Sequence, residues 1–69
     1  MKLSARNVLP GKVIEVRAGV TTSHVRIEVA GGAIITASIT NEAVGELRLQ
    51  PGDSAAAIIK ASDVIVGKG

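Results

Sequence analysis

The stretch HVRIEVAGGAIITASIT, residues 24–40, decides the fold class of this 69-residue chain. Its first six residues alternate, with Val25, Ile27 and Val29 separated by polar or charged residues, which is the pattern of a strand buried on one face. The two glycines at 31 and 32 form a turn of the kind that closes a hairpin. Residues 33–40, rich in isoleucine and threonine, form the return strand. The stretch therefore predicts an antiparallel hairpin, with His24 as an exposed strand residue.

Upstream of this hairpin the sequence is also β-like. Residues 12–17 form a strand, and residues 4–9 form an extended segment that leads into it. Gly11 lies between them, directly after Pro10, and predicts a kink or a β-bulge.

Downstream, residues 41–47 contain the one expected helix, with Thr40 or Asn41 as its cap. Residues 55–60 and 62–66 are predicted as the last strands. Five short strands with a small helix between the third and the fourth form the OB pattern, a partly open Greek-key barrel. We therefore predict an all-β, five-stranded OB-like barrel in which residues 1–69 form a single domain. An SH3-like barrel is the alternative, but it usually lacks this helix.

The composition limits how such a small domain is stabilised. A chain of this length buries only about 60% of the surface that its unfolded form exposes. Such domains usually need a disulfide, a metal or oligomerisation. The chain has no cysteine and one histidine, while 46% of its residues are hydrophobic. Oligomerisation is therefore the expected supplement, and no metal-ligand set is predicted.

Composition also argues against several classes of function. Phe, Tyr and Trp are absent and the net charge is +2, whereas single-strand binders stack bases on aromatic rings and carry a clustered basic face. No apolar run approaches the ~18 residues of a membrane helix, and no secretory signal is recognisable. The sequence offers no nucleophile–base pair and no carboxylate dyad. We expect neither a nucleic-acid nor a membrane partner, no enzymatic activity and no catalytic cofactor.

Two polar clusters are the candidates for binding chemistry. Ser4 and Arg6 are two residues apart in an extended segment, as are Lys60 and Ser62, so each pair projects from one face. Together they offer two cations and two hydroxyl donors, which suits a small doubly charged oxyanion. Thr40 adds a hydroxyl at a helix start, where unpaired N–H groups favour anions. Spacing alone leaves open whether the clusters meet or are ordinary solvated strand ends.

The arrangement of these residues resembles the molbindin, or Mop, family of small molybdate-binding proteins. The matching motifs are SARN at residues 4–7, Ile39-Thr40 before the helix, and Ile59-Lys60-Ala61-Ser62. Further matches, among them Leu9, Gly11, Glu28 to Gly32 and Gly52, extend over nearly the whole chain. The combination is specific, although each motif alone is weak.

The resemblance implies a cytoplasmic protein that stores molybdate or tungstate and takes part in its homeostasis. It implies a homo-oligomer, a hexamer built as a trimer of dimers, with the oxyanion at subunit interfaces and with metal bound only as that oxyanion. The implied ligands are Ser4, Arg6, Thr40 and Lys60. Secondary candidates are Asn7, Ala43, Ala61, Ser62 and, in a loop near the three-fold axis, Thr22.

At the position of Ala43 the family often has serine. Alanine has no hydroxyl, so here only the backbone N–H can donate to the oxyanion. Two other functions are also compatible with the sequence. One is an OB-fold nucleic-acid-binding module. The other is a purely structural oligomer in which acidic residues such as Glu15, Glu28, Glu46 or Asp53 neutralise Arg6 and Lys60.

Overall fold

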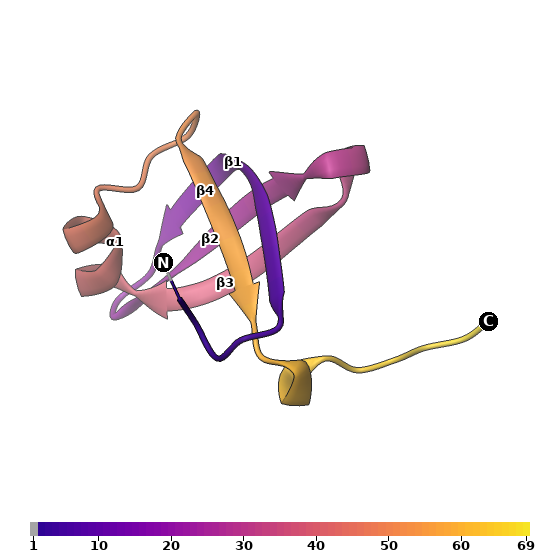
Figure 1. Cartoon of the computed structure of the whole chain (residues 1–69). Helices are drawn as coiled ribbons and strands as arrows, with labels where there is room; N and C mark the ends of the chain where they lie inside the picture. Colours follow the sequence, from indigo (N-terminus) through magenta and orange to yellow (C-terminus); the bar gives the residue numbers. More distant parts are fainter. Residues whose placement is uncertain (1) are drawn as a thin grey trace.

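The computed structural model describes residues 2–69, which form one antiparallel sheet and one short helix (Figure 1). The sheet has four strands in the order β3-β2-β1-β4. The elements along the chain are β1 (Asn7–Ala18), β2 (Thr22–Val29), the 3₁₀ turn η1 (Ala30–Gly32), β3 (Ile34–Thr40), α1 (Asn41–Leu47), β4 (Ser54–Ile59) and the 3₁₀ turn η2 (Ala61–Asp63). The all-β class and the single helix after the third predicted strand are confirmed. No helix within residues 2–69 is long and apolar enough to cross a membrane.

The predicted hairpin is present as β2 and β3. Val25, Ile27 and Val29 are buried, as the alternation predicted, and Val25 and Ile27 pair with Ala37 and Ile35 of β3. The connection is a three-residue 3₁₀ turn rather than a two-residue turn. Gly31 and Gly32 have φ of 88° and 89° within it, which is a conformation that glycine adopts without steric cost. The turn closes with a bond from the Val29 N–H to the Ala33 carbonyl at 2.8 Å.

Strand β1 pairs with two neighbouring strands, β2 and β4. Its first half, residues 7–12, pairs with β4, and residues 11–18 pair with β2. Gly11 lies where the two pairings overlap, and a Cβ there would come 2.3 Å from the Glu28 carbonyl oxygen. Glycine is thus required by the close approach of a neighbouring backbone. The register shift falls between Val13 and Glu15, two to four residues after the glycine at which a kink or bulge was expected.

The core is small. It consists of Val13, Val25, Ile27, Val29 and Ala57, with partly buried hydrophobic residues packed around it, including Val44 of the helix. The helix begins as predicted, because the Thr40 Oγ1 accepts a hydrogen bond from the Ala43 N–H at 3.0 Å. It ends at Leu47, and its C-cap, Arg48, adopts a left-handed conformation with φ of 52°.

The prediction of a fifth strand at residues 62–66 is wrong. Strand β4 ends at Ile59, and residues 61–63 form η2 instead. Two backbone bonds hold this turn, from the Asp63 N–H to the Lys60 carbonyl at 2.9 Å and from the Val64 N–H to the Ala61 carbonyl at 3.2 Å. The turn sends residues 64–69 away from the sheet (Figure 1). A β-like segment therefore has no strand beside it in its own chain, and the sheet stays a half-barrel.

Because Gly11 is crowded by a neighbouring backbone, replacing it with alanine should affect stability differently from the same replacement at an uncrowded glycine. Gly11→Ala should destabilise the fold by about 1–3 kcal/mol, because the new methyl group overpacks against backbone. The matched control is Gly45→Ala in α1, where a Cβ would meet nothing within 4 Å. That change should stabilise by about 0.5–1 kcal/mol, the usual helical preference for alanine over glycine. Urea unfolding measures both, and equal effects of the two substitutions would contradict the close approach at Gly11.

Candidate functional site

The first candidate region is the end of the sheet where β1 begins and β4 stops. Asn7 of β1 and Ile59 of β4 form the last pair there. Arg6 and Lys60 are the next residues on either side of that pair, so the antiparallel register brings both cations to the same end of the sheet. The Asn7 side chain reinforces the pairing, because its Nδ2 donates to the Ile59 carbonyl at 3.1 Å. We call Ser4, Arg6, Asn7 and residues 60–62 the basic corner.

The cations of the basic corner have no acidic partner within residues 2–69. The ion pairs in this part of the chain are Arg17–Glu15 at 3.2 Å and Arg26–Glu15 at 3.5 Å. Arg6 and Lys60 take part in neither pair, and both are exposed. Intrachain neutralisation of Arg6 and Lys60, as the structural-oligomer hypothesis supposed, does not occur in this part of the chain. The corner thus offers two cations to an anion.

The spacing of Lys60 and Ser62 predicted that both project from one strand face. The structure does not place them on a shared strand. Lys60 follows β4 as the cap of η2, and Ala61 and Ser62 begin that turn. The first N–H groups of a helical turn have no partner inside it. The Ala61 and Ser62 amides therefore add donors to the corner, beside the Lys60 ammonium and the Ser62 hydroxyl.

The second candidate region lies at the other end of β1 and contains Thr22, Thr40 and Ala43. Thr22 and Thr40 are direct partners across β2 and β3, next to the pairing of Ala18, the last residue of β1, with Ser23. The Thr40 hydroxyl oxygen accepts the Ala43 N–H, so its own hydrogen is free to be donated. The Ala43 amide, by contrast, is already used in this cap. Within one chain, these residues do not join the basic corner.

Thr22 lies in a hollow of its own. Together with Arg17, Ala18, Gly19 and His24 it lines a shallow hollow beside the β1–β2 loop. Arg17 and His24 are cross-strand partners, and both are exposed. Arg17 is already paired with Glu15 at 3.2 Å, so the anion contact expected of Thr22 stays a prediction. His24 is the exposed strand residue that its place in the alternation predicted.

Sequence reasoning missed the residues that hold the second region together. Asn41 Nδ2 donates to the carbonyls of Gly19 at 3.0 Å and Val20 at 3.2 Å, and the Asn41 backbone N–H donates to the Thr21 carbonyl at 2.9 Å. The Ser23 hydroxyl, buried at 1% exposure, donates to Asn41 Oδ1 at 2.5 Å. Asn41 thus ties the loop that precedes Thr22 to the start of the helix.

One signal of this network was present in the sequence. Ser23 occupies the inward-facing position two residues before Val25, so it is a hydroxyl in an otherwise apolar series. A buried hydroxyl needs a partner, and Asn41 supplies it from 18 residues away.

Comparison with known proteins identifies a domain family to which the chain belongs. The TOBE domain family matches residues 3–66. Among curated relatives, the probable molybdenum-pterin-binding protein of Haemophilus influenzae is 45% identical over 67 residues, which covers 97% of each chain. The chain therefore belongs to the TOBE-domain proteins.

Comparison with solved structures shows which TOBE-domain proteins the chain is similar to. MopII from Clostridium pasteurianum superposes with a TM-score of 0.91 at 40% identity, covering 97% of this chain and 100% of that one. The cytoplasmic molybdate-binding protein ModG, in a form with molybdate bound, superposes with a TM-score of 0.91 at 49% identity over 94% of this chain and 46% of that one. Within the TOBE class, the chain is a member of the molbindin (Mop) family, which confirms the resemblance in its motifs.

The Asn41 network yields a second prediction. Asn41→Ala should cost about 1–3 kcal/mol of unfolding free energy, because it leaves the buried Ser23 hydroxyl without its acceptor. Asn41→Asp keeps an acceptor for Ser23 but loses the donors to the loop, so its cost should be smaller. Glu42→Ala, the exposed neighbour on the helix, should change stability by less than about 0.5 kcal/mol. Urea unfolding ranks the three, and an Asn41→Ala variant as stable as the parent would rule out the network.

Proposed function

We propose that this chain is a binding protein, not an enzyme, and that it holds molybdate reversibly in the cytoplasm. The family and the molybdenum-binding relatives of the chain support this function, above all a 49%-identical structure with molybdate bound. The observation that carries the proposal is the basic corner. Arg6 and Lys60, 54 positions apart in the sequence, stand at one end of the sheet without an acidic partner among the described residues.

The chemistry of the corner suits a tetrahedral dianion. About two positive charges are needed to compensate two negative ones, because an uncompensated charge out of water costs several kcal/mol. Arg6 supplies a planar fork and Lys60 a compact charge. The hydroxyls and the amides at the start of η2 supply further donors, and hydrogen bonds to an ionised acceptor are about twice as strong as neutral ones. No bond of the anion changes, so binding is reversible.

The placement of Thr40 supports a site shared between copies. Thr40 lies beyond the end of β1 opposite to the basic corner, so a site that uses both must take them from different chains. We therefore propose a homo-oligomer, a hexamer arranged as a trimer of dimers, with Ser4, Arg6 and Lys60 of one copy facing Thr40 of another. Asn7, Ala61 and Ser62 contribute backbone or side-chain donors at the corner, Ala43 holds the Thr40 hydroxyl in place, and Thr22 belongs to a separate site.

The proposed role is storage and buffering of molybdenum. Tungstate has the same shape and charge as molybdate and is proposed to compete for the same sites. An anion that binds only the assembled form stabilises it by mass action, by about 2.7 kcal/mol at a free concentration one hundred times the Kd. Occupancy and assembly are linked in this way.

Titration of the purified protein with molybdate by calorimetry tests the site residues. Arg6→Ala and Lys60→Ala should each weaken binding about 10- to 100-fold, which corresponds to the roughly 1.5–3 kcal/mol of a hydrogen bond to a charged group. Lys12→Ala is the matched control, since Lys12 is exposed in the middle of β1. No heat and no thermal stabilisation in the parent protein would reject the function. If Lys12→Ala weakens molybdate binding equally, binding depends on the overall charge of the protein and not on the basic corner.

A mixing experiment tests whether the site is shared. Thr40→Ala and Arg6→Ala chains are prepared separately, unfolded, mixed in equal amounts and refolded together. If one site takes Thr40 and Arg6 from different copies, random assortment restores about a quarter of the sites with both residues intact. Native mass spectrometry with molybdate counts the bound anions. Mixtures that bind no better than either variant alone would contradict a shared site.

A further inference from the structure

Asn41 directly follows Thr40, the hydroxyl residue that the proposed function assigns to the oxyanion. Thr40 ends β3 and Asn41 begins α1. Asn41 is half-buried although its side chain is polar. A polar group taken partly out of water is normally hydrogen-bonded, and the bonds of this side chain indicate what it does for its neighbour.

The polar groups of the Asn41 side chain all bond to protein. Its Nδ2 donates to the carbonyls of Gly19 at 3.0 Å and Val20 at 3.2 Å, and its Oδ1 accepts the buried Ser23 hydroxyl. A carboxamide has two N–H donors, so both are used and neither is left for an anion. Asn41 therefore acts on an oxyanion at Thr40 through the position of Thr40, not by contact.

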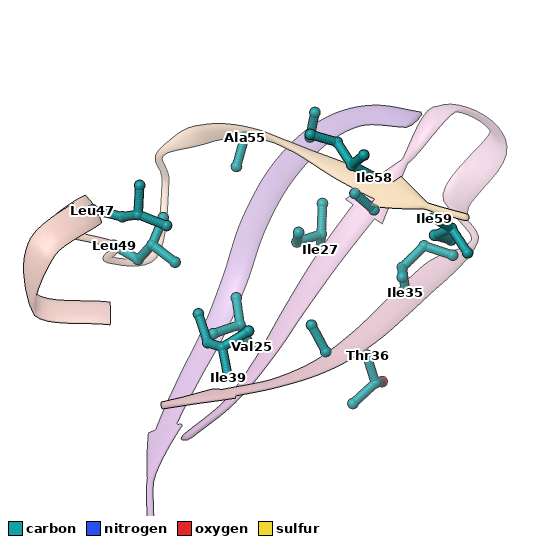
Figure 2. A pocket seen from close by; sticks show the side chains of 13 residues that line it. Val25, Ile27, Ile35, Thr36, Ile39, Leu47, Leu49, Ala55, Ile58 and Ile59 are labelled. Carbon is teal, nitrogen blue, oxygen red and sulfur yellow. The ribbon is translucent and has the colours of Figure 1, made fainter. Parts of the chain in front are cut away.

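The direction of the Thr40 hydroxyl depends on the first turn of α1. Thr40 Oγ1 accepts the Ala43 N–H at 3.0 Å, so the remaining O–H points where that turn directs it. Thr40 is exposed and alternates with Ile39, which lines the apolar groove between β3 and β4 (Figure 2). Its side chain thus lies on the face of β3 opposite to that groove, where hydrogen bonds hold it.

Apolar packing holds the helix only weakly. The helix has seven residues, none of them fully buried, and a helix of this length is not stable alone in water. Val44 packs against the core, but Leu47, which lines the groove in Figure 2, is 65% exposed. The side chain and the backbone N–H of Asn41 join the start of the helix to loop residues 19–21. Without that side chain, the first turn should shift relative to β3.

We propose that Asn41 is a positioning residue for oxyanion binding, which fixes the first turn of α1 and thereby the direction of the Thr40 O–H. This inference rests on the role of Thr40 in the proposed function, and it assigns part of the affinity to a residue that gives the anion no donor. Because the same bonds stabilise the fold, a loss of affinity alone does not separate positioning from stability.

A double-substitution cycle in molybdate affinity separates the two effects. Asn41→Ala is measured by calorimetry in the parent, in a Thr40→Val chain and in an Arg6→Ala chain, at a temperature at which circular dichroism shows every variant folded. Valine keeps the shape of threonine and lacks its hydroxyl. Gln50→Ala is the matched control, since it removes an exposed side-chain amide without changing the charge.

Positioning predicts that Asn41→Ala weakens molybdate binding at least fivefold in the parent and in the Arg6→Ala chain, but less than twofold in the Thr40→Val chain. Gln50→Ala should change the parent's affinity by less than twofold. Equal weakening in all three backgrounds would overturn the inference, because it would indicate lost folded protein or direct contact with the anion. A parent-background effect no larger than that of Gln50→Ala would overturn it as well.

Nuclear magnetic resonance of the anion-free protein gives a second readout. Three-bond couplings to the Thr40 methyl carbon report the distribution of its χ1 angle. They should show one staggered rotamer in the parent and in Gln50→Ala, and averaging over rotamers in Asn41→Ala. A single rotamer in Asn41→Ala would overturn the inference. A parent that binds no molybdate would sink the proposed function alone, and the couplings would still decide whether Asn41 positions Thr40.

Discussion

The structure depends on one constraint, the sharing of β1 between two antiparallel neighbours. A single strand pairs with β4 along its first half and with β2 along its second, and the two pairings overlap at Gly11 and Lys12. Only a residue without a side chain fits at Gly11, because the Glu28 backbone passes there. From this arrangement follow the curvature of the half-barrel, the position of the core, and the meeting of residues 6 and 60 at the end of the sheet.

The elements that local pattern determines were predictable from the sequence. The alternation at Val25, Ile27 and Val29 gave the buried face of β2, and the hydroxyl of Thr40 before an acidic first turn gave the start of the helix. The fifth strand could not be judged in this way. Residues 64–66 have strand propensity, but a strand also needs an edge to pair with, and propensity does not say which chain supplies it.

The candidate site was predictable in its residue types and not in its geometry. Arg6 and Lys60 were identifiable as cations beside hydroxyl groups, but only the register of β1 and β4 places them together. The register also separates them from Thr40, which the sequence motifs alone had grouped with them. Asn41 acts through side-chain bonds to a loop more than 20 residues earlier, and contacts of that kind leave little trace in local pattern.

The central claim is that the basic corner of one copy and Thr40 of another enclose the same oxyanion. Anomalous diffraction at the molybdenum absorption edge, from crystals grown with molybdate, tests it most directly because it locates molybdenum independently of the protein density. The account predicts peaks whose surrounding oxygens lie within about 3 Å of Arg6 and Lys60 donors of one chain and of the Thr40 hydroxyl of a neighbour. Molybdenum found only elsewhere on the protein, or Arg6 and Lys60 facing bulk solvent in every copy, would contradict it.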